Sequence, residues 1–242
     1  MNLHIRSWYG RFGNNVHQIQ NCLYIALENG YNIILPPHEY FNTTYIVLND
    51  KVSKDDQCIT DKDNFFYRHS EITKESRKIL QGIFKIKADK IFSERDIIVH
   101  LRGGDIFTQT PHKLYITPPL SYFENIIDRG NYENIIIVSE DRKNPIVNRL
   151  LQKYKNAIHQ TQSLTNDIKI ILGAKNIIES VGTFVTALAI LSNVVENLHV
   201  PSYKFLGVEI DGVNTIKYDL EEYRQKMFPW KNTKEQISIM LT

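Results

Sequence analysis

The residues best suited to chemistry follow an apolar run near the middle of the chain. Residues 97–99 are Ile, Ile and Val, and residues 100–105 are His, Leu, Arg, Gly, Gly and Asp. The β-branched run predicts a strand buried in a parallel sheet, whose carboxyl end is where open α/β sheets bind ligands. The planar guanidinium of Arg102 suits a phosphate. Gly103 and Gly104 let backbone N–H groups approach a ligand, so we expect capture of a phosphorylated or diphosphorylated ligand.

Three further polar loops each follow a predicted strand. They comprise residues 10–15, residues 139–141 and residues 180–183. The last two loops and the loop at 100–105 belong to the same half of the chain, so we expect them to line one edge of one sheet. The order of the four loops favours a single ligand site over four unrelated turns.

Chemistry suggests a role for each loop. Arg102 would hold a diphosphate by bidentate hydrogen bonds, and backbone N–H groups after Gly103 and over 180–183 would add donors at a helix N-terminus. The edge of a base or the ribose hydroxyls would be contacted by His100, Glu140 or Asp141. Asn14 would reach across from the other half of the chain toward the transferred group.

Each loop also has a purely structural interpretation. The glycines at 10–13 can form a tight turn, His100 can be a hydrogen-bonded structural histidine, and Arg102 with Asp105 can be a plain salt bridge. Ser139, followed by two acids, suits a helix N-cap, and so does the segment Ser180–Thr183. These alternatives remain open at the level of sequence.

The apolar periodicity predicts an α/β fold with two Rossmann-like halves facing a cleft. We expect strands within residues 2–8, 33–35, 97–101, 134–138 and 176–180. We expect helices over residues 16–29, 71–92, 120–128, 144–153, 167–172, 184–192 and 219–227. Residues 40–70 are expected to form loops with short strands. The first half covers 1–94, the second covers 95–210, and a tail over 211–242 is expected to pack back on the first half.

The composition excludes several classes of protein. The chain has 242 residues and a net charge of +2, which is too small to indicate nucleic-acid binding. Its two cysteines lack metal-ligand spacing, and no metal site is expected. There is no apolar run long enough to cross a bilayer and no secretory signal, so we expect a cytoplasmic protein.

In motif order, residues 5–195 resemble the fucosyltransferase superfamily that uses GDP-fucose. Residues 10–14 resemble its N-terminal Gly-x-x-Gly-Asn loop, which includes Gly13, and residues 100–105 resemble its His-x-Arg-Arg-x-Asp motif. Residues 139–141 resemble its acidic loop. Asp167 followed by the segment from Ser180 to Phe184 resembles its Asp…Ser-x-Ser-x-Phe segment.

The resemblance implies a GT-B fold with the acceptor-side half first and the nucleotide-binding half second. It implies transfer with inversion and without an essential metal or other cofactor. By position, Arg102 would contact the β-phosphate, and His100 would lie near the guanine or ribose. Ser180 and Thr183 would support the phosphates, and Asn14 would lie near the sugar and acceptor.

One position departs from the family pattern, because Gly103 stands where the motif has its second arginine. The change is compatible with weaker diphosphate binding, with a replacement cation such as Arg11, or with a different nucleotide sugar. The motif resemblance as a whole nevertheless implies a glycosyltransferase that moves fucose from GDP-fucose to a glycan hydroxyl. The alternatives are another sugar donor, or a non-catalytic module that binds a nucleotide sugar or glycan.

The general base of such a transfer has several candidates. Asp105 is the nearest carboxylate in the motifs, although it can instead orient Arg102. The acceptor side offers Glu39, with His17 and His38 as weaker candidates. Aromatic residues at 40, 41, 45 and 65–67 can either stack on sugar rings or form a small core.

Overall fold

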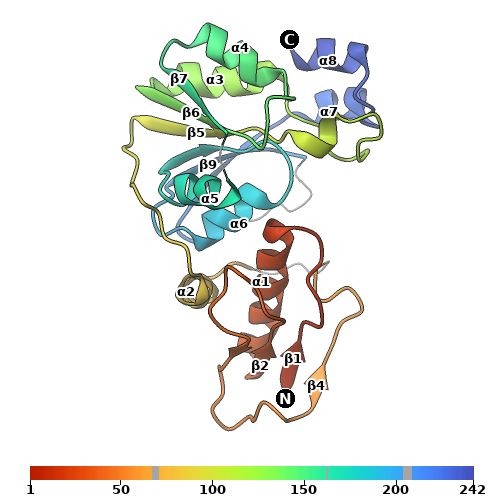
Figure 1. Ribbon diagram of the computed structural model, residues 1–242, viewed down its shortest axis with the longest axis vertical. Helices are drawn as coiled ribbons and strands as arrows, with labels where there is room; N and C mark the ends of the chain where they lie inside the picture. The colour runs from red at the N-terminus through yellow and green to blue at the C-terminus, as the bar shows by residue number, and fades with distance from the viewer. Residues whose placement is uncertain (67–70, 162, 204–208) are drawn as a thin grey trace.

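The computed structural model describes residues 1–66, 71–161, 163–203 and 209–242, and it contains two α/β halves stacked along its long axis (Figure 1). The first half has a four-stranded sheet in the order β3-β2-β1-β4. β1 pairs parallel with β2 and β4, and β2 pairs antiparallel with β3. The strands are β1 (Asn2–His4), β2 (Asn32–Ile34), β3 (Tyr45–Ile46) and β4 (Cys58–Ile59), and the helices are α1 (Phe12–Asn29) and α2 (Lys74–Ile83).

The second half is built on a six-stranded parallel sheet in the order β10-β9-β8-β5-β6-β7. Its strands are β5 (Asp96–His100), β6 (Asn134–Val138), β7 (Ala157–Gln160), β8 (Asn176–Ile178), β9 (Asn197–Pro201) and β10 (Asn214–Tyr218). Its helices are α3 (Leu120–Gly130), α4 (Ile146–Lys153), α5 (Leu164–Leu172), α6 (Phe184–Leu191), α7 (Glu221–Met227) and α8 (Lys234–Met240), with a 3-10 turn at Gly104–Phe107. The predicted pair of α/β halves is therefore present.

The three predicted strands that precede the polar loops lie side by side at the centre of the second sheet. β5 pairs with β6 on one side and with β8 on the other. Their apolar residues are buried on both faces, as a parallel sheet covered by helices requires. The carboxyl ends of these strands therefore meet at one edge, which brings the loops after them together.

The predicted helix over 71–92 is observed only as α2. Phe84 leaves the helix in an extended conformation and bridges antiparallel to Phe41, while the Lys85 N–H donates to the Tyr40 carbonyl at 2.9 Å. The apolar side chains after Ile83 therefore bury themselves by pairing with residues 40–41, which ends the helix early.

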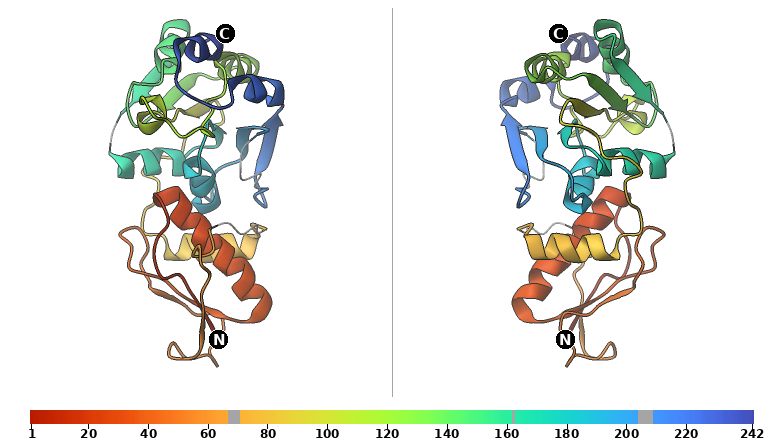
Figure 2. Two further views of the ribbon diagram at one scale, coloured as in Figure 1. Left: turned by 90° about the vertical axis from the view of Figure 1, so that its right-hand side faces the viewer. Right: turned by 90° about the vertical axis from the view of Figure 1, so that its left-hand side faces the viewer.

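Beyond Asp211, whose backbone bonds to Ile72 and Arg77 of the first half, the tail packs on the second half and not, as expected, on the first. Met227, Trp230 and Met240 are buried in the core cluster that contains Ile97 and Val99 of β5. The Trp230 indole N–H also donates to the Ile106 carbonyl at 2.7 Å. In Figures 1 and 2, α7 and α8 accordingly lie against the second half, far from the N-terminus. Large apolar side chains in the tail thus cover a face of the second sheet.

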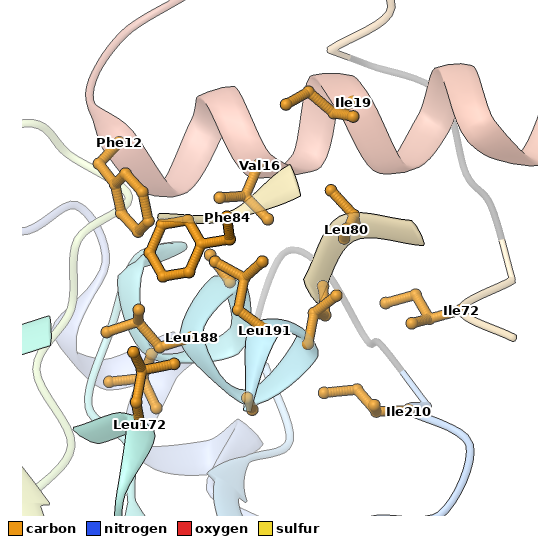
Figure 3. Packing of buried hydrophobic residues seen from close by; sticks show 14 of the residues in the cluster. Phe12, Val16, Ile19, Ile72, Leu80, Phe84, Leu172, Leu188, Leu191 and Ile210 are labelled. Atoms are coloured by element: carbon orange, nitrogen blue, oxygen red, sulfur yellow. The ribbon is translucent and has the colours of Figure 1, made fainter. Parts of the chain in front are cut away.

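Helix α6 joins the two halves through a shared core. One cluster of buried residues combines Phe12, Val16 and Leu80 of the first half with Leu188 and Leu191 of α6 (Figure 3). The contact is also polar. From α2, Arg77 donates to the carbonyls of Ile190 and Ser192 at 3.3 and 2.7 Å, and Gln81 donates to the Ser192 carbonyl at 3.0 Å. These donors satisfy carbonyls at the C-terminal end of α6 that have no partner within the helix.

No helix among the described residues combines the length and the hydropathy needed to cross a membrane.

Candidate active site

The four polar loops meet around a cavity of about 410 Å³, which we call the first cavity. It lies between the start of α1 and the carboxyl ends of β5, β6 and β8. The predicted site residues that line it are Gly13, Asn14, His100, Arg102, Gly103, Asp105, Ser139, Glu140, Asp167, Thr183 and Phe184. Residues from both halves of the chain are therefore brought to one place.

Arg102 is held firmly in this cavity. Its Nε and Nη2 atoms donate to the two carboxylate oxygens of Asp105 at 3.1 and 2.7 Å. The guanidinium carbon lies 4.0 Å from the ring centroid of Tyr115, and only 15% of the side chain is exposed. Gly182 leaves room for Nη1, because a Cβ at that position would lie 2.7 Å from it. The sequence did not point to Tyr115, which lies in an irregular loop outside every motif.

A second arginine reaches the first cavity from the other half. Arg11, just before α1, lies 3.3 Å from Asp105 and 3.5 Å from Glu140, and 65% of its side chain is exposed. The carboxylates of the second half therefore attract cations from both sides of the cavity. Burial acts to raise the pKa of Asp105, but the hydrogen bonds and charge of Arg102, together with the charge of Arg11, hold it below its ordinary value.

Asp141 fills the space beside Gly103 where a side chain would stand. A Cβ on Gly103 would lie 2.3 Å from the Asp141 carboxylate. That carboxylate accepts the Gly104 N–H at 3.2 Å, and Gly104 has a φ of +55°, a conformation that favours glycine. Gly104 and Asp141 thus shape the loop and are not among the residues that line the first cavity.

Asn14 and Thr183 connect the two halves at the wall of the first cavity. The Thr183 hydroxyl donates to the Asn14 side-chain oxygen at 2.6 Å. Thr183 is the N-cap of α6 but makes no side-chain capping hydrogen bond. The close approach depends on Gly13, since a Cβ there would lie 2.6–2.8 Å from Thr183 atoms. The donor N–H groups of the first turn of α6 are left uncapped by Thr183 beside the cavity.

The far end of the first cavity is lined by His100, Phe184 and Asp167. The rings of His100 and Phe184 have centroids 5.5 Å apart. Asp167 on α5 is only 7% exposed, and its Oδ1 atom has no hydrogen-bond partner among the described residues. Burial, with a smaller contribution from the Glu140 charge, raises the pKa of Asp167 to about 7.

The two predicted serines act on backbone groups. The buried Ser180 hydroxyl accepts the Arg102 N–H at 3.1 Å, which ties the end of β8 to the end of β5. Ser139 donates to the Asp141 carbonyl at 2.6 Å and contacts the His159 ring nitrogen Nε2 at 2.7 Å. Both serines therefore hold loops in place. Ser139 also lines the first cavity, whereas Ser180 does not line it and instead lines the second cavity described below.

The acceptor-side candidates are not brought to the cavities described here. His17 is buried in α1, and the Glu39 side chain is exposed. His38 packs among aromatic rings, including Trp8 at 5.1 Å, and its Nδ1 accepts the Tyr40 N–H at 3.1 Å. Burial lowers the pKa of His38, so this imidazole favours its neutral form.

The aromatic residues proposed for sugar stacking divide between core and surface. Phe41, Phe65 and Phe66 are buried, and Tyr40 and Tyr45 are half-buried. Tyr67 lies outside the described residues. The core interpretation holds for the phenylalanines, although the ring of Phe66 also reaches a cavity.

A second cavity of about 430 Å³ adjoins the first. The residues that line both cavities are Asn14, Tyr115, Val181 and Thr183. The remaining lining of the second cavity comes from His112 and Leu114, from Tyr9 and Phe66, from Ser180 and Gly182, from residues 201–203, and from Arg224 of α7. We call these four shared residues, where the two cavities adjoin, the ridge.

No group of three or more His, Cys, Asp or Glu side chains within the described part of the chain is arranged to hold a metal ion.

Comparison with family models and with curated proteins finds no match. Among solved structures, the chain is similar to NodZ α-1,6-fucosyltransferase of Bradyrhizobium soaked with GDP-fucose, at 9% identity and a TM-score of 0.47 over 79% of this chain and 92% of that one. It is similar to POFUT1 in complex with GDP-fucose, at 10% identity and a TM-score of 0.47 over 86% and 97% of the two chains. It is also similar to the E. coli heptosyltransferase WaaC with ADP-2-deoxy-2-fluoro heptose, at 10% identity and a TM-score of 0.49 over 98% of both chains.

Proposed function

We propose that this protein is an inverting glycosyltransferase that moves a sugar, with fucose from GDP-fucose as the leading donor, to a hydroxyl of a glycan acceptor. The observation that carries the proposal is the first cavity, where Arg102, the start of α6 and Asn14 from the opposite half come together. The choice of fucose rests on the motif resemblance described above.

The leaving diphosphate would lie beside Arg102 and the N-terminal turn of α6. Both favour a negative charge, the first by charge-assisted hydrogen bonds and the second by its N–H groups and dipole. Arg11 would approach the same charge from the first half and supply the cation that Gly103 lacks. The base of the nucleotide would lie toward His100, Phe184 and Asp167, where the cavity has a ring face and a carboxyl group.

In the proposed reaction the acceptor oxygen forms a bond to the anomeric carbon as the bond from that carbon to the diphosphate breaks. Negative charge builds on the leaving group in the transition state, so fixed donors around it accelerate the reaction. Asn14 would lie beside the transferred sugar, at the ridge between the two cavities. The transfer is proposed to proceed without a metal cofactor.

Asp105 fits an orienting role better than that of general base. Its two carboxylate oxygens already bind Arg102, and its lowered pKa makes it a weak proton acceptor. Its ionised carboxylate instead holds both arginines in the cavity. The acceptor proton would then pass to another group or to water.

A non-catalytic module that binds a nucleotide sugar or glycan is the second candidate. The observation that favours it is the ridge, because the described residues shared by the two cavities include no carboxylate and no histidine to accept a proton. Such a module would bind the sugar nucleotide without turnover, so an assay for released diphosphate distinguishes it from the enzyme.

The first test is a thermal-shift screen of the protein against GDP-fucose, GDP-mannose, GDP, UDP-sugars and dTDP-rhamnose without added metal. A ligand that binds only the folded state raises its stability with the logarithm of its concentration over Kd. We expect the midpoint to rise with GDP and GDP-fucose. A rise with another nucleotide alone would replace the donor, and no rise with any of them would count against the enzyme.

A further inference from the structure

The second cavity is placed to present a molecule to the first. The ridge between them includes the Asn14–Thr183 hydrogen bond and the ring of Tyr115, which also stacks on Arg102. A molecule in the second cavity would therefore meet the transferred sugar at Asn14. The size of the second cavity, about 430 Å³, is within the range of small-molecule sites.

Aromatic and apolar side chains form most of its wall. Tyr9 and Phe66 from the first half pack with ring centroids 4.6 Å apart, and Tyr115 and Tyr203 come from the second half. Tyr9 is 42% exposed and Leu114 is 46% exposed, although both are large and apolar. Flat rings with polar tips suit a ligand that has one apolar face and several hydroxyls, such as a pyranose ring.

The two cavities differ in their charged groups. The first cavity is lined by the carboxylates of Asp105, Glu140 and Asp167 and by the guanidinium groups of Arg11 and Arg102. Among the described residues that line the second cavity, the one side chain with a full charge is Arg224. Its Nη1 pairs with Glu221 at 2.9 Å, and the rest of the guanidinium fork carries further donors. An acidic group in the second cavity would therefore meet the Arg224 cation, and the described residues that line this cavity include no carboxylate to repel it.

The position of Arg224 is fixed by its surroundings. In the same helix, Tyr223 donates its hydroxyl to the Thr117 carbonyl at 2.9 Å. Tyr203 donates to the preceding carbonyl of the loop, that of Ile116, at 3.0 Å. Met227, one turn later, is buried in the core. The tail is therefore anchored on the loop that supplies His112 and Tyr115, and it places the guanidinium at the cavity wall.

We propose that the second cavity is the acceptor site and that it takes a glycoside with an acidic substituent, whose ring stacks on the aromatic wall while the acid binds Arg224. This inference rests on the proposed function for the identity of the occupant as acceptor. The cavity chemistry alone supports the class of ligand, an acidic sugar.

The test uses methyl β-glucuronide and methyl β-glucoside, which differ in one carboxylate. Their affinities are measured by saturation-transfer NMR titration of the full chain and of Arg224→Gln. The control is Lys226→Gln, which removes the same charge from an exposed position on the same helix. We expect the glucuronide to bind about tenfold more tightly than the glucoside to the wild type and to Lys226→Gln, since a hydrogen bond to a charged group contributes about 1.5 kcal/mol or more.

In Arg224→Gln the two glycosides should bind equally. Tyr9→Ala should weaken both glycosides by a similar factor, because it removes stacking area and not charge. Equal affinity of the two glycosides for the wild type, no binding of either, or unchanged preference in Arg224→Gln overturns the inference. Circular dichroism and the thermal midpoint of each variant confirm that it is folded.

The same samples are titrated with GDP to separate this inference from the proposed function. GDP binding without any preference for the glucuronide would overturn the acceptor inference and leave the glycosyltransferase proposal standing. Preference for the glucuronide without binding of any nucleotide would overturn the glycosyltransferase proposal and retain an acidic-sugar site. Arg224→Gln should bind GDP as the wild type does, because Arg224 is not among the residues lining the first cavity.

Discussion

The two cavities differ more in charge than in size. The first, of about 410 Å³, gathers two arginines and three carboxylates around the uncapped start of α6. The second, of about 430 Å³, is lined mainly by rings and by Arg224. The residues of the ridge belong to both and are uncharged. Charged side chains are therefore concentrated in the first cavity, while the described lining of the second has a single cation among rings and small side chains.

The charged groups and the aromatic rings come from different kinds of segment. The ionic groups of the second half follow β5 and β6 directly or lie on α5, whose places are fixed by the sheet and its covering helices. The rings of Tyr9, Phe66 and Tyr115 come from loops, which tolerate change better than sheet ends do. In the second half, the charged groups of the first cavity are thus held by the sheet and its covering helices. The rings of the second cavity lie on segments that can vary without disturbing the sheet.

Arg102→Ala should have the largest effect on the difference between the two cavities, because it removes a cation that lines only the first. Loss of a charged hydrogen-bond donor costs about 1.5–3 kcal/mol for each bond to a ligand, so GDP should bind about 100-fold more weakly. Isothermal titration calorimetry with GDP measures the change, and circular dichroism checks folding. Binding of methyl β-glucuronide in the second cavity should persist. An unchanged Kd for GDP would mean that Arg102 serves only as the partner of Asp105.

Asp167→Asn should make the free energy of unfolding less dependent on pH. The pKa of Asp167 rises from 3.8 to about 7 on folding, so the folded state binds more protons than the unfolded state between these values. Stability is therefore lost as pH increases through this window, by up to about 4 kcal/mol above neutral pH. Urea unfolding at pH 4 and pH 8 should show the variant gaining stability over the wild type only at the higher pH.

Glu140→Gln separates the two causes of the raised Asp167 pKa in the same urea-unfolding measurement. Burial is the larger cause of the raised pKa of Asp167, and the Glu140 charge is the smaller. Removing that charge should therefore reduce, but not abolish, the loss of stability between pH 4 and pH 8. A difference between Asp167→Asn and the wild type that stays constant from pH 4 to pH 8 would show that Asp167 is already ionised in the folded protein.

Gly103→Arg tests whether the missing motif arginine can simply be restored. The new side chain would displace the Asp141 carboxylate, which lies 2.3 Å from the required Cβ position and accepts the Gly104 N–H. We expect a loss of about 1–3 kcal/mol in the free energy of unfolding from the broken hydrogen bonds, and no gain in GDP affinity. The urea midpoint and a GDP titration measure both effects. Tighter GDP binding at unchanged stability would contradict this account of Asp141.

The sequence was sufficient to locate the centre of the fold. β5, β6 and β8 are buried on both faces, so their apolar runs are continuous and their polar ends are distinct. β7 and β10 were not predicted because they are edge strands with half-exposed residues and no apolar run. β9 was missed because His199 and Pro201 interrupt its pattern.

The first cavity was predicted more fully than the second for the same reason. Arg102, Asp105 and Thr183 stand at strand ends or at a helix start, positions that periodicity reveals. Tyr115 lies in a loop and Arg224 in the tail, and their places depend on tertiary contacts such as those of Trp230 and Tyr223. A signal was present in the spacing of Met227, Trp230 and Met240, three large side chains in an otherwise polar tail.

Helix α6 has a consequence for how ligands enter. Because it shares one core with α1 and α2, and because Arg77 and Gln81 bind the carbonyls at its C-terminal end, the two halves have no free hinge between them there. We therefore expect the cleft to keep its width when empty. Ligands would then meet a preorganised groove, and selectivity would depend on fit more than on closure of the two halves.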